Sequence, residues 1–407
     1  MIRYFDKNVP LTISMWDFSW LTCSHPGGSF ADLSRCVAEA ATCGYNTLRV
    51  DVFPHFYLQK EHAFAPQGLD RRIRSWGDVL VPGGYTVDVR AKVMELANLC
   101  RQHGIWLGLD TWTSLKILAN ISIIELDEEE HWCREWAATW VKALKMMRED
   151  GVLERAIWVA PCNEVPLFLG GKLRSVLLAD TKKRREGEVD FCENLPELDH
   201  VFQRVNHWLG EAIYEEIHRD GIPLSYSSLG AENYGARLTD IYDLVDIHFM
   251  PDVILTDEDR IAMEKAAPGA SKFSLHAELD TYNLALYGAA WNQACRRNYA
   301  DMLRLAHAYA QGVFAHTTLS SGKRLPVVVT EAYGPCGYPD HPEVSWGWYK
   351  NWNADAARIF SGYDFAGLTL SNYAEPLFNL WHDTDWQRLT NLYILHAVQP
   401  EFFGQDE

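Results

Sequence analysis

Eight short apolar segments, each followed by a helical pattern, restrict the fold of this 407-residue chain more than any other feature. Short apolar runs of this length are typical of buried strands, and regular alternation with helices predicts a parallel sheet. The predicted strands are Leu11–Trp16, Asn46–Asp51, Ile105–Asp110, Ile157–Cys162, Pro223–Ser227, Leu244–Phe249, Val327–Glu331 and Gly367–Ser371.

Between these strands, apolar residues recur at three- and four-residue spacing, as on the buried face of an amphipathic helix. The first helix is expected to begin after an N-cap at Ser29 and to stop at Gly44. A tryptophan stripe, Trp132, Trp136 and Trp140, is interpreted as packing of a helix against the sheet. The other predicted helices cover residues 88–103, 128–150, 198–219, 291–316, 348–360 and 385–396.

A parallel sheet can close into a barrel or remain open and doubly wound. An open sheet that binds a dinucleotide carries a G-x-G-x-x-G turn after its first strand, and residues 23–29 (CSHPGGS) lack this pattern. The sequence therefore predicts an α/β fold, a single (β/α)8 TIM barrel over residues 1–407. Length beyond the roughly 250 residues of a typical barrel is expected in loop insertions on the carboxyl-terminal face, near 52–87, 165–199 and 250–290.

The charge of the chain limits its classes of partner. It has 37 Lys and Arg against 55 Asp and Glu, a formal net charge of −18, which disfavours binding to nucleic acid or an anionic membrane surface. Its nine cysteines show no paired spacing, which is typical of a reducing compartment. No apolar run is long enough to span a bilayer and no export signal is recognisable, so we expect a cytoplasmic protein. The oligomeric state stays open.

Two glutamates stand at the ends of predicted strands. The fourth strand leads into Asn163-Glu164 and the seventh ends at Glu331. Because the strands of a parallel barrel end at one face, these residues can meet although they are 331 − 164 = 167 positions apart. Two facing carboxyl groups are what glycosidic bond cleavage requires. One of them would protonate the leaving oxygen, and the other would attack the anomeric carbon or activate a water. From their placement at the strand ends, we predict that the two carboxyl groups lie about 5 to 5.5 Å apart.

In the order and placement of these motifs, the sequence resembles the clan of retaining (β/α)8-barrel glycoside hydrolases that includes the family-five cellulases and a "sugar-binding cellulase-like" branch. The resemblance implies that Glu164 is the acid/base and Glu331 the nucleophile. It also implies that Asn163 hydrogen-bonds the sugar 2-hydroxyl, that Arg49 orients Glu331 and keeps it ionised, and that His248 matches the strand-six His-x-Tyr segment. The implied activity is hydrolysis of a β-linked oligosaccharide or glycoside by double displacement, with no cofactor and no metal.

Three strand ends depart from the pattern of the clan. The strand-six tyrosine is replaced by Met250, and Tyr282 or Tyr333 could supply the missing hydroxyl from a loop. Strand three ends in Asp110–Trp112 rather than in the usual histidine, and strand eight ends in Ser371–Tyr373 where cellulases commonly place a tryptophan. These differences leave both glutamates in place and leave the identity of the sugar open.

Aromatic residues near strand ends are candidates for stacking on sugar rings, and the chain has 16 tryptophans. The segment 276–278 (HAE) looks like part of a metal site but lacks a second pair of ligands, and is interpreted as a loop at the cleft. The substrate-binding candidates at strand ends and in loops are Trp16, Asp17, Trp112, Tyr282 and Trp381.

Two other functions stay open at this point. A non-catalytic carbohydrate-binding barrel is compatible with the altered strand ends, and a transglycosylase would use the same two glutamates. Schiff-base aldolases are excluded because no predicted strand contains or ends in lysine. Metal-dependent amidohydrolases are excluded because none of the 15 histidines forms a His-x-His pair. The insertions favour a small oligosaccharide or glycoside over a long polymer.

Overall fold

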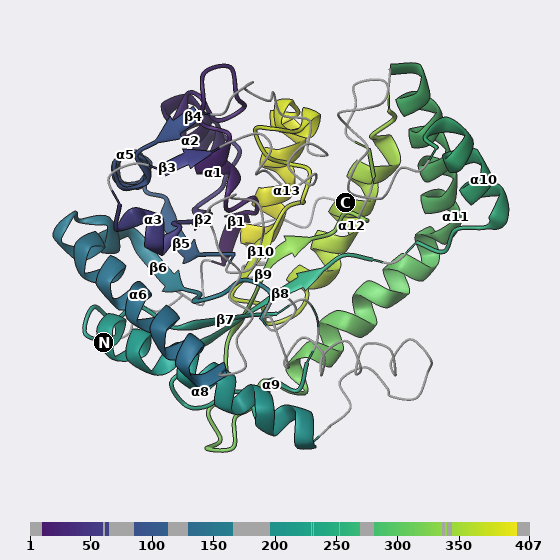
Figure 1. Cartoon of the computed structure of the whole chain (residues 1–407). Coiled ribbons are helices and arrows are strands. Elements are labelled where there is room, and N and C mark those ends of the chain that lie inside the picture. The colour runs from purple at the N-terminus through teal and green to yellow at the C-terminus, as the bar shows by residue number, and fades with distance from the viewer. Residues whose placement is uncertain are drawn as a thin grey trace.

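The computed structural model describes residues 10–59, 62–64, 85–112, 129–165, 196–228, 230, 232–251, 253–268, 281–335, 338–339 and 344–396. Eight strands lie at the centre of the molecule with helices around them (Figure 1). Their order in the sheet is β6-β5-β2-β1-β10-β9-β8-β7, and all neighbours are parallel. The strands are β1 Leu11–Ser14, β2 Thr47–Asp51, β5 Trp106–Asp110, β6 Ala156–Val159, β7 Ser225–Ser228, β8 Leu244–Phe249, β9 Val327–Ala332 and β10 Gly367–Thr369.

A parallel bridge between Val159 and Leu224 joins β6 to the residue before β7, which brings the two edges of the sheet together. Each of the eight predicted strands is present within a few residues of its expected bounds. The α/β TIM-barrel fold predicted from the sequence is therefore confirmed.

The helices begin and end where capping residues allow. Asp88 accepts a hydrogen bond from the backbone N–H of Ala91 at the start of α5, and Gly104 ends this helix with a φ of 71°. The N-cap of α2 is Asp32 rather than Ser29, because the Asp32 carboxylate accepts the N–H of Arg35. The helices are α1 Ser19–Thr22, α2 Leu33–Thr42, α3 Pro54–Tyr57, α5 Val89–His103, α6 Glu129–Glu149, α8 Pro196–His218, α9 Tyr234–Arg237, α10 Asp257–Ala266, α11 Thr281–Phe314, α12 Gly347–Ser361 and α13 Thr384–His396, with 3-10 turns at Val152–Arg155 and Asn379–His382.

Two of the expected insertions contain secondary structure that the sequence pattern did not predict. Residues 52–87 include an antiparallel pair, β3 His62–Phe64 and β4 Tyr85–Val87. Residues 250–290 include α10 and the first ten residues of α11, which starts at Thr281 rather than at the expected Trp291. In Figure 1, α10 and α11 lie on the right of the barrel. No helix among the described residues combines the length and the apolar character needed to cross a membrane.

The barrel interior is apolar at one end and polar at the other. Leu11, Ile13, Leu244 and Val328 pack around the Trp158 ring at the amino-terminal end of the strands. Gly108 makes room for this ring, because a Cβ at that position would lie 2.0 Å from it. Polar side chains fill the carboxyl-terminal half, which places the candidate site above an apolar floor.

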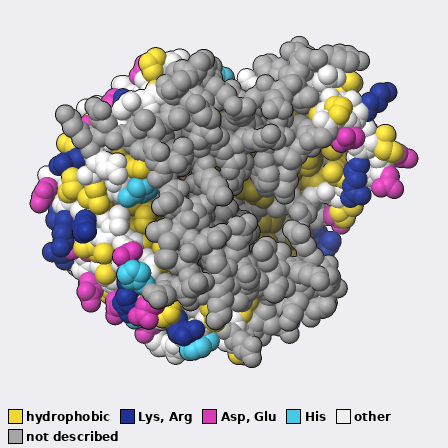
Figure 2. All heavy atoms as spheres, in the orientation of Figure 1, with side chains coloured by type: hydrophobic (Ala, Val, Ile, Leu, Met, Phe, Trp, Pro, Cys, Tyr) yellow, Lys and Arg dark blue, Asp and Glu magenta, His cyan; other side chains and the backbone are white. Residues whose placement is uncertain are grey.

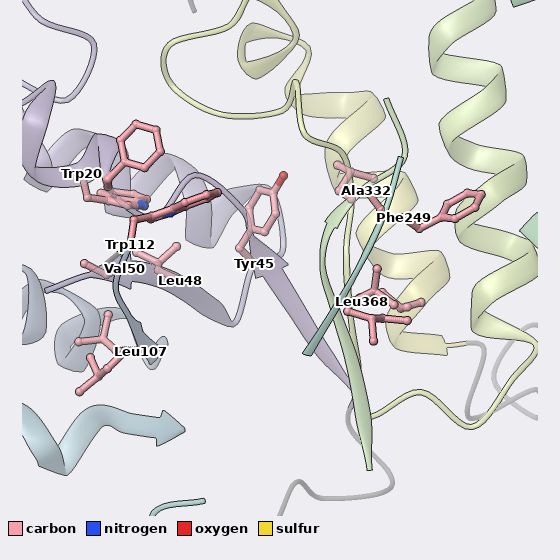
Figure 3. Close-up of a cluster of buried hydrophobic side chains, with 14 of the residues drawn as sticks. Trp20, Tyr45, Leu48, Val50, Leu107, Trp112, Phe249, Ala332 and Leu368 are labelled. Carbon is pink, nitrogen blue, oxygen red and sulfur yellow. The ribbon is translucent and has the colours of Figure 1, made fainter. Parts of the chain in front are cut away.

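The larger core lies between the strands and the outer helices. Leu48 and Val50 of β2 project into it together with Leu107 and Trp20 (Figure 3), whereas Arg49 between them faces the barrel interior, as strand alternation requires. On the outside, charged side chains of both signs gather over α6, α8 and α10 (Figure 2). They include ion pairs from Arg148 of α6 to the α8 region.

Candidate active site

A buried arginine stands at the centre of the candidate site. Arg49 projects from β2 into the barrel, where its Nε donates to Asp110 Oδ2 at 2.8 Å and its Nη1 donates to Glu331 Oε1 at 2.6 Å. Its Nη2 hydrogen-bonds Asn163 Oδ1 and lies 3.4 Å from Asp17 Oδ2. One guanidinium group therefore connects the ends of strands from both sides of the barrel.

Glu331, near the end of β9, is 4% exposed. Its Oε1 accepts from Arg49 and lies 3.5 Å from the Asn163 amide nitrogen, which donates to it. Burial acts to raise the pKa of this carboxyl, but the facing charges of His248 and Arg49 outweigh burial and lower the pKa below its usual value. Glu331 is therefore ionised at neutral pH.

Glu164 lies in the turn after β6, and its carboxylate faces Glu331. One oxygen of each glutamate and one ring nitrogen of His248 lie within 4.8 Å of one another. Burial raises the pKa of Glu164, and the hydrogen bond with His248 opposes this rise only in part. The pKa values of the two facing glutamates are thus shifted in opposite directions, upward for Glu164 and downward for Glu331.

The turn that carries Asn163 and Glu164 is tightly held. Glu164 has a φ of 47°, in the left-handed region that non-glycine residues seldom adopt. Ser227 of β7 donates its hydroxyl to Asn163 Oδ1 at 2.7 Å and accepts the backbone N–H of Glu164 at 3.2 Å. The indole N–H groups of Trp136 and Trp140 in α6 both donate to the carbonyl of Pro161, each at 2.9 Å. The tryptophan stripe therefore anchors the start of this turn.

Ser227 was not among the residues expected from the sequence. Its signal is the polar segment 225–228 (SYSS), which stands where the sequence predicts a strand.

His248 at the end of β8 is enclosed by carboxylates. Its Nδ1 lies 2.7 Å from Glu164 Oε1 and 3.6 Å from Glu331 Oε2, and its Nε2 lies 3.9 Å from Asp246 Oδ2. Burial acts to lower the pKa of this imidazole, but the three negative charges outweigh it and raise the pKa to about 9. His248 is therefore positively charged at neutral pH and donates to Glu164. Asp246 was also missed from the sequence.

Three aspartates close the ends of β1, β2 and β5. Asp17 accepts from the N–H of Phe18 and from the indole of Trp112, at 2.8 and 2.6 Å. Asp51 accepts the backbone N–H groups of residues 53 and 112. Asp110 accepts the backbone N–H of residue 111. Burial raises the pKa of Asp17 and Asp51 to about 7 and that of Asp110 to about 8.

The three candidate tryptophans differ in exposure. Trp16 is half-buried, donates its indole N–H to the carbonyl of Asn372 and packs against Phe378 with ring centroids 5.7 Å apart. Trp112 is 9% exposed, and its indole is bound to Asp17. Trp381 is 2% exposed, and stacks on Tyr45. The Trp381 indole donates to Glu39 of α2, so Trp381 is held by the outer helix layer.

No tyrosine hydroxyl reaches Glu331 among the described residues. The Tyr333 ring packs outside the barrel against Phe360 and Phe249, at 5.2 and 6.4 Å, and its buried hydroxyl has no hydrogen-bond partner within the described ranges. The side chain of Tyr282 and the segment 276–278 lie outside the described residues. In place of a tyrosine, His248 is the group that faces Glu331 Oε2.

Glu164, His248 and Glu331 are close enough together to hold a metal ion. A histidine must give up its second proton to act as a ligand, and the carboxyl groups around His248 favour the charged imidazole. The Arg49 guanidinium already pairs with Glu331, so a metal ion would have to compete with two positive groups.

Comparisons with known proteins agree with this fold. The model of the family described as sugar-binding cellulase-like matches residues 13–172. No curated protein is similar enough in sequence to count as a relative.

Two solved structures are similar over almost the whole chain. One is a protein provisionally described as a glycoside hydrolase from Parabacteroides distasonis, with 20% identity, a TM-score of 0.68 and coverage of 98% of this chain and 97% of that one. The other is a GH5-4 broad-specificity endoglucanase from an uncultured bacterium, with 11% identity, a TM-score of 0.51 and coverage of 95% and 94%. The resemblance inferred from the sequence is thereby confirmed: the chain is similar in fold, and over residues 13–172 in sequence, to cellulase-like glycoside hydrolases.

Proposed function

We propose that this protein is a retaining glycoside hydrolase that acts on a β-linked oligosaccharide or glycoside. The observation that carries the proposal is the pair Glu164 and Glu331, whose oxygens approach within 4.8 Å and whose pKa values are shifted in opposite directions. An ionised carboxylate that faces a protonated one supplies both groups of a double displacement.

In the first step, the Glu331 carboxylate attacks the anomeric carbon while Glu164 gives its proton to the glycosidic oxygen. The bond between this oxygen and the anomeric carbon breaks, the alcohol departs, and the sugar is held as an ester of Glu331. In the second step, the Glu164 carboxylate takes a proton from water, whose oxygen attacks the anomeric carbon and releases Glu331.

The neighbouring residues support these roles. Arg49 stabilises the charged form of Glu331 and fixes its Oε1, which leaves Oε2 for the attack. The Asn163 amide, 3.5 Å from Glu331 Oε1, is placed beside the nucleophile, where the 2-hydroxyl of a bound sugar would lie. Trp16 is the most exposed of the three candidate tryptophans, and we propose it as the stacking platform.

The separation of the glutamates favours retention over inversion. In inverting enzymes the two carboxyl groups are roughly 6.5 to 9.5 Å apart, because a water molecule must fit between nucleophilic base and sugar. The approach of one oxygen of each glutamate to within 4.8 Å supports the shorter separation of retaining enzymes.

A panel of aryl β-glycosides and β-linked disaccharides tests the proposal, with the first-formed anomer followed by NMR. We expect the β-anomer to appear before mutarotation. An α-anomer would mean inversion, and sugar–sugar products at low acceptor concentration would mean transglycosylation. If the unmutated protein binds sugars but turns over no glycoside in the panel, the proposal fails in favour of a carbohydrate-binding barrel.

A further inference from the structure

The strongest unexplained feature is the environment of His248. Its imidazole is surrounded by carboxylates from three elements: Glu164 from the turn after β6, Glu331 from β9 and Asp246 from its own strand. Arg49 lies beyond Glu331, and Tyr309 of α11 holds the backbone by donating its hydroxyl to the His248 carbonyl at 2.7 Å. The ring nitrogens therefore face only carboxyl groups among the described residues.

Asp246 lies behind the imidazole, on the side away from Glu164. It is two residues before His248, so strand alternation turns both side chains into the barrel. Thr330 of β9 donates its hydroxyl to Asp246 Oδ1 at 2.6 Å and fixes the carboxylate. The other oxygen, Oδ2, faces His248 Nε2 at 3.9 Å, and within the described residues neither atom has a hydrogen-bond partner. This contact is attractive only while His248 carries its second proton.

We propose that Asp246, held by Thr330, is a positioning residue that keeps a proton on His248 throughout the catalytic cycle. This inference rests on the proposed function, because it assigns separate tasks to the two oxygens of Glu164. Oε1 remains the acceptor of the His248 Nδ1–H in both steps, whether Glu164 is neutral or charged. Oε2 is then the oxygen that gives the proton to the leaving group and later takes one from water.

The electrostatics support this assignment. The three surrounding carboxylates raise the pKa of His248 to about 9, although burial acts against the charged ring. The charge is needed most after the first step, when Glu164 has lost its proton and is a buried anion. A charged donor at Oε1 stabilises this anion without supplying the proton that is transferred.

The test is a nitrogen-15 NMR titration of the His248 ring in the free protein, which requires no substrate. Asp246→Asn removes the charge but keeps the size and the acceptor for Thr330. We expect the His248 midpoint to fall by about one pH unit or more, because an opposite charge at this range shifts a pKa by about that amount. Asp243→Asn is the matched control, because Asp243 is a buried carboxylate at the opposite end of β8, paired with Lys323.

Kinetics provide a second readout. Activity of Asp246→Asn should match the wild type below the lowered midpoint and fall by about tenfold above it, where the charged hydrogen bond to Glu164 is lost. A purely structural role would lower activity equally at every pH. Thr330→Val should lower the His248 midpoint by less than Asp246→Asn does. Thr330→Ser keeps the hydroxyl, so its His248 midpoint should match that of the wild type. If Asp246→Asn does not fold, these two variants are compared instead.

An unchanged His248 midpoint in Asp246→Asn, or an equal fall in Asp243→Asn, would overturn the inference. The titration also separates it from the proposed function. If the midpoint shifts as expected but the wild type cleaves no glycoside, Asp246 holds the His248 proton and the glycosidase assignment is the part that fails.

Discussion

Two groups of buried carboxylates lie at the same end of this barrel and differ in how their oxygens are used. In Asp17, Asp51 and Asp110, on the β1, β2 and β5 side, both oxygens accept N–H groups of the protein. In Glu164 and Glu331, Oε1 accepts hydrogen bonds, whereas Oε2 accepts none from the described residues. The aspartates use both oxygens to hold the scaffold, whereas each glutamate has one oxygen to which no described residue donates a hydrogen bond.

This difference shows that burial and a raised pKa do not identify a catalytic carboxyl by themselves. Burial raises the pKa of all three aspartates to about 7 or 8, as far as in many catalytic acids. Their hydrogen bonds nevertheless use both oxygens of each carboxyl group to hold strand ends in place. The glutamates are distinguished by their opposite pKa shifts and by their unused oxygens.

The largest expected effect comes from removing Glu331, the proposed nucleophile. Glu331→Ala should lower turnover by about 10⁴-fold or more, because no other described group is poised to form the ester with the sugar. Azide should then enter from the vacated face and give a glycosyl azide of inverted configuration. Asp17→Asn is the control, since it should lower Tm and retain most of the turnover. Residual activity of Glu331→Ala within tenfold of the wild type contradicts the assignment.

Removal of Glu164, the proposed acid/base, should have a smaller effect that depends on the leaving group. Glu164→Ala should lower turnover of poor leaving groups by about 10²- to 10⁴-fold, the usual contribution of a general acid. An aryl glycoside with a good leaving group should still form the covalent intermediate, which then accumulates because water lacks its base. Rapid-quench mass spectrometry would detect this ester. Added azide needs no base, so it should restore turnover with retained configuration; an inverted azide product would assign the roles the other way round.

The pH dependence of stability tests the part that the three buried aspartates play in the scaffold. Burial raises the pKa of Asp17, Asp51 and Asp110 in the folded state, so the folded protein holds protons that the unfolded chain has released. The sign follows from linkage: their contribution to stability is full below pH 4 and is lost as the pH rises toward about 8. Tm should therefore fall between about pH 5 and 8. Asp51→Asn should make this slope less steep, and an identical slope would show that Asp51 is ionised in the folded protein.

Much of the fold and the positions of the two glutamates could be predicted, because both follow from the order of strands and helices in the sequence. The strand–helix alternation defines the eight strands, and their ends define which residues share a face, which is how Glu164 and Glu331 were found. Arg49 was predicted from the resemblance to the glycoside hydrolase clan, and in the structure it lies between Leu48 and Val50 and donates to Glu331.

The other contacts of the site depend on the direction of individual side chains, which the spacing of residues in the sequence does not indicate. Trp381 follows a strand end as Trp16 does, yet its indole turns to Glu39 on an outer helix. Asp17 was expected to contact substrate, but both of its oxygens are occupied by protein donors. Ser227 and Asp246 contact Asn163 and His248. The polar segment 225–228 marks the strand of Ser227 but does not reveal its partner, and a lone aspartate within a strand carries no signal of one.

The smallest expected effect concerns the anchor of the Glu164 turn. Trp136 and Trp140 both donate to the Pro161 carbonyl, so either one alone still satisfies it. Trp136→Phe or Trp140→Phe should each cost about 0.5–1.5 kcal/mol of stability, the net contribution of one hydrogen bond, with turnover nearly unchanged.

The double variant leaves a buried carbonyl without a donor, which costs about 1–3 kcal/mol and loosens the strained backbone at Glu164. Its loss in kcat should therefore exceed the product of the single losses in a double-mutant cycle. Trp132→Phe, on the same helix and stacked on Trp136, is the matched control; additive effects on kcat would mean that the two indoles only pack the helix and do not hold the turn.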